Sequence, residues 1–168
     1  MIYNALAAYL VGTNFDVSPL LIKRALDNLG TMAGRNNIVK TDKLTIIDDC
    51  YNASPVSMES SIDVLKLSEG RKVAILGDMF ELGENADKFH YQLGQYTVSA
   101  DIDVVVCVGN LMEKTYMGAK LGNNEVHYFK TVDECLSNLP EILKQDDNVL
   151  VKASHGMNFV RIVDFLKS

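Results

Sequence analysis

From residue 36 onward, short apolar runs alternate with longer amphipathic stretches, and this alternation constrains the fold more than any other feature. Three runs, Lys72–Gly77, Asp103–Gly109 and Asn148–Lys152, are nearly continuous in apolar residues. Such runs are typical of strands that helices cover on both faces. Further strands are predicted at 37–40, 44–48 and 126–129, and helices at 57–67, 86–99, 111–121, 132–143 and 159–166.

Strands that alternate with helices predict an α/β fold with a doubly wound, mostly parallel, Rossmann-like sheet. The strands at 37–40 and 44–48 are separated only by the turn Thr41-Asp42-Lys43, which predicts a hairpin. We therefore expect one antiparallel strand at an edge of the sheet.

A short helical segment is predicted ahead of this region. Apolar residues recur at helical spacing over Ile2–Leu10, and a break is expected at 12–14. The pair Ser18-Pro19 is typical of a helix start, so a second helix is predicted over 20–29 with Gly30 closing it. The expected division is a helical segment at 1–30 and an α/β domain at 31–168, with the linker at 31–37.

Composition excludes several classes of protein. The 168 residues, 48% apolar and 23% charged, are typical of one globular domain rather than a disordered or coiled-coil chain. The net charge of −6 argues against a nucleic-acid platform. We expect neither a membrane span nor a signal peptide. The three cysteines form no CxxC pattern, so reduced thiols in a cytoplasmic protein are expected.

Polar residues follow the predicted strands. Ligands of open α/β sheets bind beyond the carboxyl ends of the strands, so the loops there are expected to face one crevice. These loops, rich in Asp, Asn, Ser, His and Gly, are 48–52, 77–79, 109–110 and 153–156. Their residue types suit a polar small molecule.

Each candidate residue has a functional and a structural interpretation. Asp49 could accept hydrogen bonds from ribose or join a metal site, or it could cap a turn. Asn52 could contact a ligand or shape the tight turn before the next helix. Arg35, in the predicted linker, could reach a phosphate or remain a solvated charge.

The other candidates lie after the next strands along this edge. Asp78 and Glu81 could serve in acid–base chemistry or bind an ammonium group, or they could reflect the acidic preference of a helix start. Ser154 and His155, beside Lys152, could bind a carboxylate or phosphate, whereas an exposed loop is the structural alternative for His155.

The sequence contains no phosphate-binding loop of its own. Neither GxGxxG after a strand nor GxxxxGK[ST] occurs. His90 and His127 show no metal-ligand spacing and are interpreted as structural, and no metal site is predicted.

Three motifs, in order, carry a resemblance to a known family. They are Ile47-Asp-Asp-Cys-Tyr-Asn-Ala-Ser-Pro55, Ala74-Ile-Leu-Gly-Asp-Met-Phe-Glu-Leu-Gly83 and Val149-Leu-Val-Lys-Ala-Ser-His-Gly-Met157. Together they resemble the C-terminal domain of the Mur ligases, and the resemblance covers essentially the whole chain. Residues 1–30, with Asn4-Ala-Leu-Ala-Ala8, are similar to the helical end of that family's central ATPase domain.

The resemblance implies a bacterial cytoplasmic enzyme of peptidoglycan synthesis that uses ATP and Mg²⁺. It would join D-alanyl-D-alanine to a UDP-linked muramoyl tripeptide through an acyl phosphate. The implied nucleotide contacts are Asn4 for adenine, Arg35 for phosphates, Asp49 for ribose, and Asn52. The implied dipeptide contacts are Asp78, Glu81, Ser154 and His155.

The chain departs from the family pattern in three ways. Lys152-Ala153-Ser154-His155 stands where the family usually has Lys-Gly-Ser-Arg, and Ser54 replaces a usual Asn. The phosphate-binding loop, the magnesium ligands and the UDP-binding domain are missing from these 168 residues. We therefore expect a fragment that is inactive alone and packs against its missing N-terminal and central domains.

Other interpretations remain open at this point. A stand-alone small-molecule-binding α/β module would need no ligase chemistry. A phospho-receiver-like switch domain would use Asp48, Asp49, Asp78 and Lys152. A purely structural interaction domain is the third, although four polar strand-end loops exceed what a scaffold needs.

Overall fold

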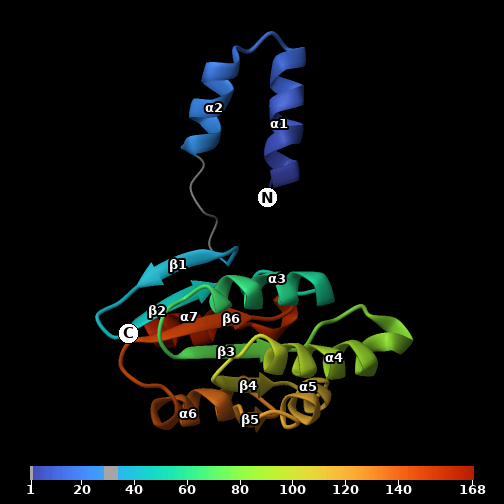
Figure 1. Cartoon of the computed structure of the whole chain (residues 1–168), viewed down its shortest axis with the longest axis vertical. Helices are drawn as coiled ribbons and strands as arrows, with labels where there is room; N and C mark the ends of the chain where they lie inside the picture. The colour runs from blue at the N-terminus through green and yellow to red at the C-terminus, as the bar shows by residue number, and fades with distance from the viewer. Residues whose placement is uncertain (1, 29–33) are drawn as a thin grey trace. The chain divides into compact units, whose positions relative to one another are not determined.

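The computed structural model describes residues 2–28 and 34–168. Contacts divide the chain into two compact units, residues 1–31 and 32–168 (Figure 1).

The first unit is a pair of helices, α1 (Ile2–Asn14) and α2 (Pro19–Asp27). The predicted break at Gly12 is wrong, because α1 continues to Asn14. A Cβ at Gly12 would lie 2.8 Å from Cδ1 of Ile22, so this glycine permits close contact with α2. Ser18 caps α2 as predicted. The helix ends at Asp27, and the predicted closing residue Gly30 lies outside the described residues.

The second unit is built on a six-stranded sheet with the order β1-β2-β6-β3-β4-β5. Strands β2 to β6 run parallel, and β1 pairs antiparallel with β2 at one edge, as predicted. The strands are β1 (Asn37–Lys40), β2 (Leu44–Asp48), β3 (Lys72–Gly77), β4 (Val104–Val108), β5 (Glu125–Phe129) and β6 (Asp147–Lys152). The last strand thus lies between β2 and β3, and the carboxyl ends of these three strands are neighbours.

Helices connect the parallel strands. They are α3 (Pro55–Lys66), α4 (Ala86–Ser99), α5 (Met112–Ala119), α6 (Val132–Ile142) and α7 (Val160–Lys167), with short 3₁₀ helices η1 (Gly83–Asn85) and η2 (His155–Met157). The predicted boundaries agree to within two residues. Two differences reach two residues: α5 ends at Ala119 rather than 121, and α3 begins at Pro55 rather than Ser57 because Ser54 caps it.

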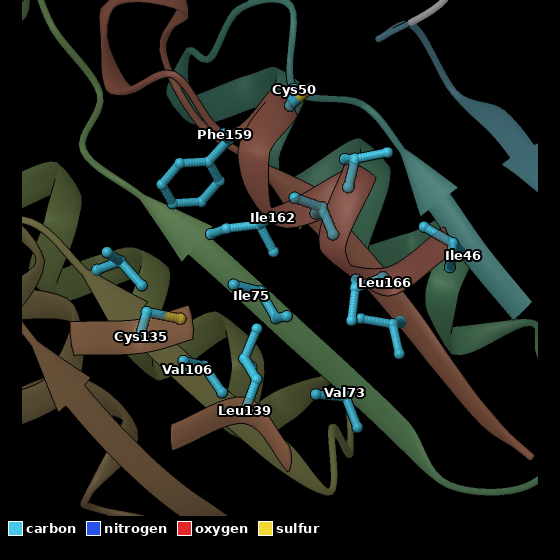
Figure 2. Packing of buried hydrophobic residues seen from close by; sticks show 14 of the residues in the cluster. Ile46, Cys50, Val73, Ile75, Val106, Cys135, Leu139, Phe159, Ile162 and Leu166 are labelled. Carbon is cyan, nitrogen blue, oxygen red and sulfur yellow. The ribbon is translucent and has the colours of Figure 1, made fainter. Parts of the chain in front are cut away.

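The sheet separates two apolar cores. Along β3, Val73 and Ile75 face the core under α6 and α7, whereas Ala74 and Leu76 face the core under α3, α4 and α5. Figure 2 shows the first core, where Phe159 and other side chains of α6 and α7 pack over Ile75 and its neighbours. Burial on both faces explains the continuous apolar runs in the sequence.

Candidate functional site

A pocket of about 520 Å³ opens at the carboxyl ends of β2, β6 and β3. Three loops line it, one after each strand, and they contribute residues 51–54, 80–82 and 154–156. The pocket thus lies after three of the four strands expected to border the crevice, although after β3 its lining is residues 80–82 rather than the predicted 77–79. The fourth, 109–110, packs against the carboxylate of Asp78 instead, where a Cβ on Gly109 would lie 2.4 Å from Oδ1.

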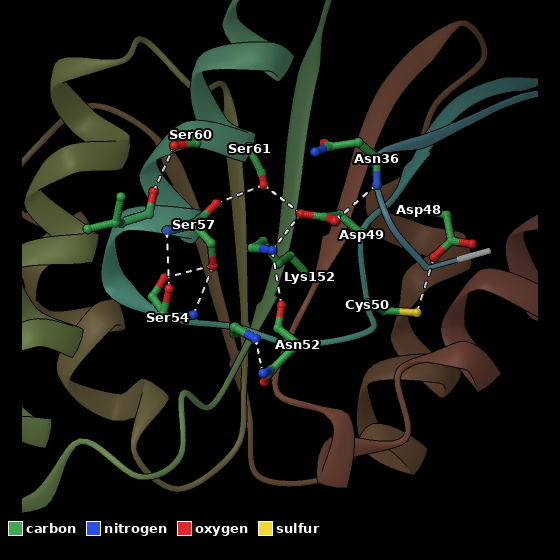
Figure 3. Close-up of polar contacts among 12 residues, drawn as sticks. Asn36, Asp48, Asp49, Cys50, Asn52, Ser54, Ser57, Ser60, Ser61 and Lys152 are labelled. Carbon is green, nitrogen blue, oxygen red and sulfur yellow. Dashed lines mark hydrogen bonds and ion pairs between the residues drawn. The ribbon is translucent and has the colours of Figure 1, made fainter. Parts of the chain in front are cut away.

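Asp49 is the centre of a polar network beside the pocket (Figure 3). Its Oδ2 accepts hydrogen bonds from Nζ of Lys152 at 2.5 Å and from Oγ of Ser61 at 2.6 Å. Its Oδ1 accepts from the backbone N–H of Asn36 at 3.0 Å. The side chains of Lys152 and Asp49 are 3% and 11% exposed, so they form a buried ion pair that joins β6 to the end of β2.

The neighbouring carboxylate of Asp48 holds the start of the second unit. Its Oδ2 accepts from the backbone N–H of Gly34, and its Oδ1 accepts from Sγ of Cys50 at 3.1 Å. Burial and this carboxylate raise the pKa of the Cys50 thiol to about 12. These contacts give the Asp48 carboxylate a structural role at the end of β2.

Arg35 and His155 both lie against Tyr51. The guanidinium carbon of Arg35 is 4.2 Å from the centre of the Tyr51 ring, a cation–π contact. The imidazole of His155 is centred 5.7 Å from the same ring. Both side chains belong to exposed residues, so a cation and an imidazole are grouped at the wall that Tyr51 provides.

Asn52 lines the pocket, but its side chain also shapes the turn. Its Oδ1 accepts from the backbone N–H of Ala53 at 2.8 Å, and its carbonyl oxygen accepts from Nζ of Lys152 at 3.1 Å. Both interpretations drawn from the sequence are thus compatible with this position, because the amide nitrogen of Asn52 can still donate to a ligand.

Asp78 and Glu81, predicted as a pair, occupy different environments. Asp78 is 5% exposed, and its Oδ1 accepts from the backbone N–H of Met112 at the start of α5. Burial raises the pKa of Asp78, and the backbone donors at the helix start oppose this effect. Glu81 is exposed, has φ 62° and lines the pocket. Of the two, only Glu81 is a pocket residue.

Ser154 connects two walls of the pocket. Its Oγ accepts from the backbone N–H of Phe80 at 2.9 Å, and its own N–H donates to the carbonyl oxygen of Asp78. A hydroxyl has one hydrogen to donate in addition to accepting, so Ser154 can also donate to a ligand.

The remaining predicted residue, Asn4, lies exposed on α1 in the first unit. Three residues at the site were not predicted from the sequence. They are Ser61, which is hydrogen-bonded to Asp49 12 positions earlier in the chain, and the aromatic wall residues Tyr51 and Phe80. The position of Tyr51 and Phe80 within the two motif loops was a usable signal for the walls, whereas Ser61 gave none.

Among residues 2–28 and 34–168, no group of three or more His, Cys, Asp or Glu side chains is arranged to hold a metal ion. Within the same residues, no helix is long and apolar enough to cross a membrane.

The profile of the Mur ligase family, glutamate ligase domain, matches residues 34–155. The chain belongs to the Mur ligase family. The matched segment includes every residue that lines the pocket except Gly156, which directly follows it. This Mur ligase domain is also 34% identical, over 99% of its length, to the UDP-N-acetylmuramoyl-tripeptide–D-alanyl-D-alanine ligase of Bacillus subtilis.

Solved structures agree with this assignment. A crystal structure of MurF from Acinetobacter baumannii superposes with a TM-score of 0.90 at 29% identity and covers 98% of this chain. The MurF ligase of Thermotoga maritima in complex with ADP superposes with a TM-score of 0.72 at 28% identity and covers 88%. The chain spans only 36% to 38% of the lengths of these three relatives.

Proposed function

We propose that this chain is the C-terminal domain of an ATP-dependent ligase that joins D-alanyl-D-alanine to UDP-N-acetylmuramoyl-tripeptide through an acyl phosphate. The observation that carries the proposal is the pocket, which is lined by three motif loops that lie, apart from Gly156, within the matched family segment. The name of the Bacillus subtilis relative supports the choice of substrates. Alone, the domain is expected to be inactive.

One wall of the pocket is proposed to receive the nucleotide. Arg35 would pair with ATP phosphates, because a guanidinium matches phosphate geometry. Asn52 would donate from its amide nitrogen, and Asp49 would accept from ribose hydroxyls with the lone pairs that its three protein donors leave. Separately, Asn4 of the first unit is proposed to contact adenine in the parent enzyme. The MurF ligase of Thermotoga maritima is described in complex with ADP, which supports nucleotide use by the parent enzyme.

Other residues at the pocket are proposed to hold the dipeptide. Glu81 would attract its ammonium group, and the hydroxyl of Ser154 and the imidazole of His155 would hold its carboxylate. Asp78, also predicted as a dipeptide residue, would act through the loop that it anchors. This arrangement positions the dipeptide amine for attack on the acyl phosphate, because holding two reactants in place lowers the entropic barrier.

Mg²⁺ would neutralise the phosphates of ATP, and we assign its ligands to the rest of the parent enzyme.

The first unit supplies a further argument for a parent enzyme with additional domains. Tyr3, Leu10 and Phe15 are 82%, 65% and 75% exposed, and apolar side chains on this scale mark an interaction surface. We propose that residues 1–30 are the helical end of the central domain of the parent enzyme, and that this surface packs against the rest of that domain in the bacterial cytoplasm.

The receiver-like alternative is not favoured by the contacts of the acidic residues. Asp48 holds Gly34, Asp49 holds Lys152, and Asp78 holds Met112. The three carboxylates thus serve three separate structural contacts, and they do not gather around one phosphorylation site.

A chimera tests the proposed function. This chain replaces the aligned C-terminal part of the Bacillus subtilis relative, and phosphate release is measured with ATP, UDP-N-acetylmuramoyl-tripeptide and D-alanyl-D-alanine. We expect release that requires all three substrates, and a chimera carrying Glu81→Gln should need at least about tenfold more dipeptide. A folded chimera that releases no phosphate, or release that does not depend on the dipeptide, would contradict the proposal.

A further inference from the structure

His90 is a completely buried histidine on α4 that no proposed step uses. Its Nε2 lies 3.0 Å from the backbone nitrogen of Met79, and its Nδ1 lies 2.7 Å from the carbonyl oxygen of Ala86. A backbone N–H can only donate, so Nε2 must accept from Met79. Nδ1 therefore carries the hydrogen and donates it to Ala86, and the imidazole is neutral in this arrangement.

Met79 is the middle residue of a loop that is held at three consecutive positions. The carboxylate of Asp78 accepts from the start of α5, the N–H of Met79 donates to His90, and the N–H of Phe80 donates to Oγ of Ser154. The three partners come from α5, α4 and the loop after β6. The path of the loop is thus fixed from three sides.

Directly after this fixed stretch, the backbone turns into the left-handed region at Glu81, with φ 62°. This conformation is uncommon for a residue other than glycine, and it persists where the surrounding contacts enforce it. Glu81 lines the pocket. The contacts of residues 78–80 therefore determine where the one pocket carboxylate of this loop lies.

We propose that His90 is a positioning residue of the pocket: by accepting the N–H of Met79, it fixes the loop that presents Glu81 to the ammonium group of the dipeptide. The identity of that ligand rests on the proposed function above, whereas the bond between His90 and Met79 does not. The required feature is a hydrogen-bond acceptor at the position of Nε2. A side chain that fills the same space without an acceptor would not hold the loop.

The tautomer of His90 gives a first test that needs no substitution. Long-range ¹H–¹⁵N NMR of the 168-residue chain reports which ring nitrogen carries the hydrogen. We expect the hydrogen on Nδ1 and an unprotonated Nε2. A hydrogen on Nε2 would overturn the proposal, because that nitrogen could not accept from Met79.

Two substitutions separate the acceptor from the bulk of the side chain. His90→Gln keeps a side-chain oxygen near the position of Nε2, whereas His90→Leu fills the space without an acceptor. His127→Gln, at a half-buried histidine on β5, is the matched control. In amide exchange of the chain, the N–H of Met79 should exchange at least about tenfold faster in His90→Leu, and stay near the unsubstituted rate in His90→Gln and the control.

The chimera adds a kinetic readout. His90→Leu should raise the KM for D-alanyl-D-alanine by about tenfold or more and leave the KM for ATP unchanged, and His90→Gln should restore most of the loss. The proposal would be overturned if the unsubstituted chimera, His90→Leu and His90→Gln had the same KM for the dipeptide. It would also be overturned if His90→Leu and His90→Gln both folded and raised that KM equally. If His90→Leu does not fold, the tautomer measurement and the kinetics of His90→Gln still test the proposal. An inactive unsubstituted chimera would refute the proposed function, while the tautomer and exchange tests of His90 would stand.

Discussion

Replacing Asp49 with Ala is expected to destabilise the second unit strongly. The substitution removes the partner of Lys152, whose side chain is 3% exposed and has its ammonium 2.5 Å from the carboxylate. It also removes the acceptor of the Asn36 N–H and one of the two acceptors of the Ser61 hydroxyl, which keeps the carbonyl oxygen of Ser57 at 2.8 Å. A cation that is buried and has lost its counter-ion cannot recover its hydration without moving the strand that carries it.

The magnitude follows from this burial. Removing one partner of a buried ion pair costs about 3–5 kcal/mol, whereas an exposed pair contributes about 1 kcal/mol or less. A domain of ordinary stability has about 5–15 kcal/mol in total, so Asp49→Ala should remove at least about a fifth of it. With an m value of about 2 kcal/mol/M, the urea midpoint should fall by roughly 1.5–2.5 M.

Urea unfolding followed by far-ultraviolet circular dichroism measures this change. Asp133→Ala is the control, because its partner Arg161 and Asp133 itself are 46% and 75% exposed, and it should cost about 1 kcal/mol or less. The double variant Asp49→Ala/Lys152→Met should be more stable than Asp49→Ala alone, since it leaves no unpaired cation. A loss in Asp49→Ala no larger than that of the control would refute the reasoning.

Three further outcomes are expected. Asp78→Ala should cost about 1 kcal/mol by removing the acceptor of the Met112 N–H, whereas Asp78→Asn keeps an acceptor and should be at least as stable as the unsubstituted chain at neutral pH. Because burial raises the pKa of Asp78 in the fold, the stability gained by Asp78→Asn should vanish as the pH falls through that raised pKa. A gain that persists in acid would contradict this. Burial raises the pKa of both Cys50 and Cys135 to about 12, so neither thiol should react with a disulfide reagent until urea unfolds the chain, and rapid labelling of the native chain would refute this. Gly94→Ala should destabilise by about 2 kcal/mol despite the better helix propensity of alanine, because a Cβ there would lie 2.1 Å from a carbonyl oxygen of α5; an unchanged thermal midpoint would contradict that packing.

The sheet was predictable because strands that are buried on both faces have nearly continuous runs of apolar residues. Runs such as Lys72–Gly77 have apolar residues on both sides of the strand, and the structure buries both. Helix starts were less certain where capping decides them. Ser54 caps α3 and Pro55 begins it, two residues before the predicted start. A break was predicted at Gly12, but α1 continues through this residue to Asn14, and Gly12 packs closely against Ile22 of α2.

The location of the pocket followed from the fold class, but the division of labour among its residues did not. Sequence alone treated Asp78 and Glu81 as one acidic pair, whereas the structure buries Asp78 under α5 and leaves Glu81 in the pocket. The contacts of Asp49 with Lys152 and Ser61 join residues separated by 103 and 12 positions. Such pairings depend on how strands and helices meet, and no local spacing records them.

The central claim is that this chain works as one domain of an ATP-dependent ligase. The most direct measurement is the sequence of the genomic DNA upstream of the codon for Met1. The account predicts an open frame that continues upstream through a GxxxxGK[ST] phosphate-binding loop, which the chain itself does not contain. A start codon at Met1 with its own ribosome-binding site, and no such loop encoded in the same frame, would contradict it and favour a stand-alone binding module.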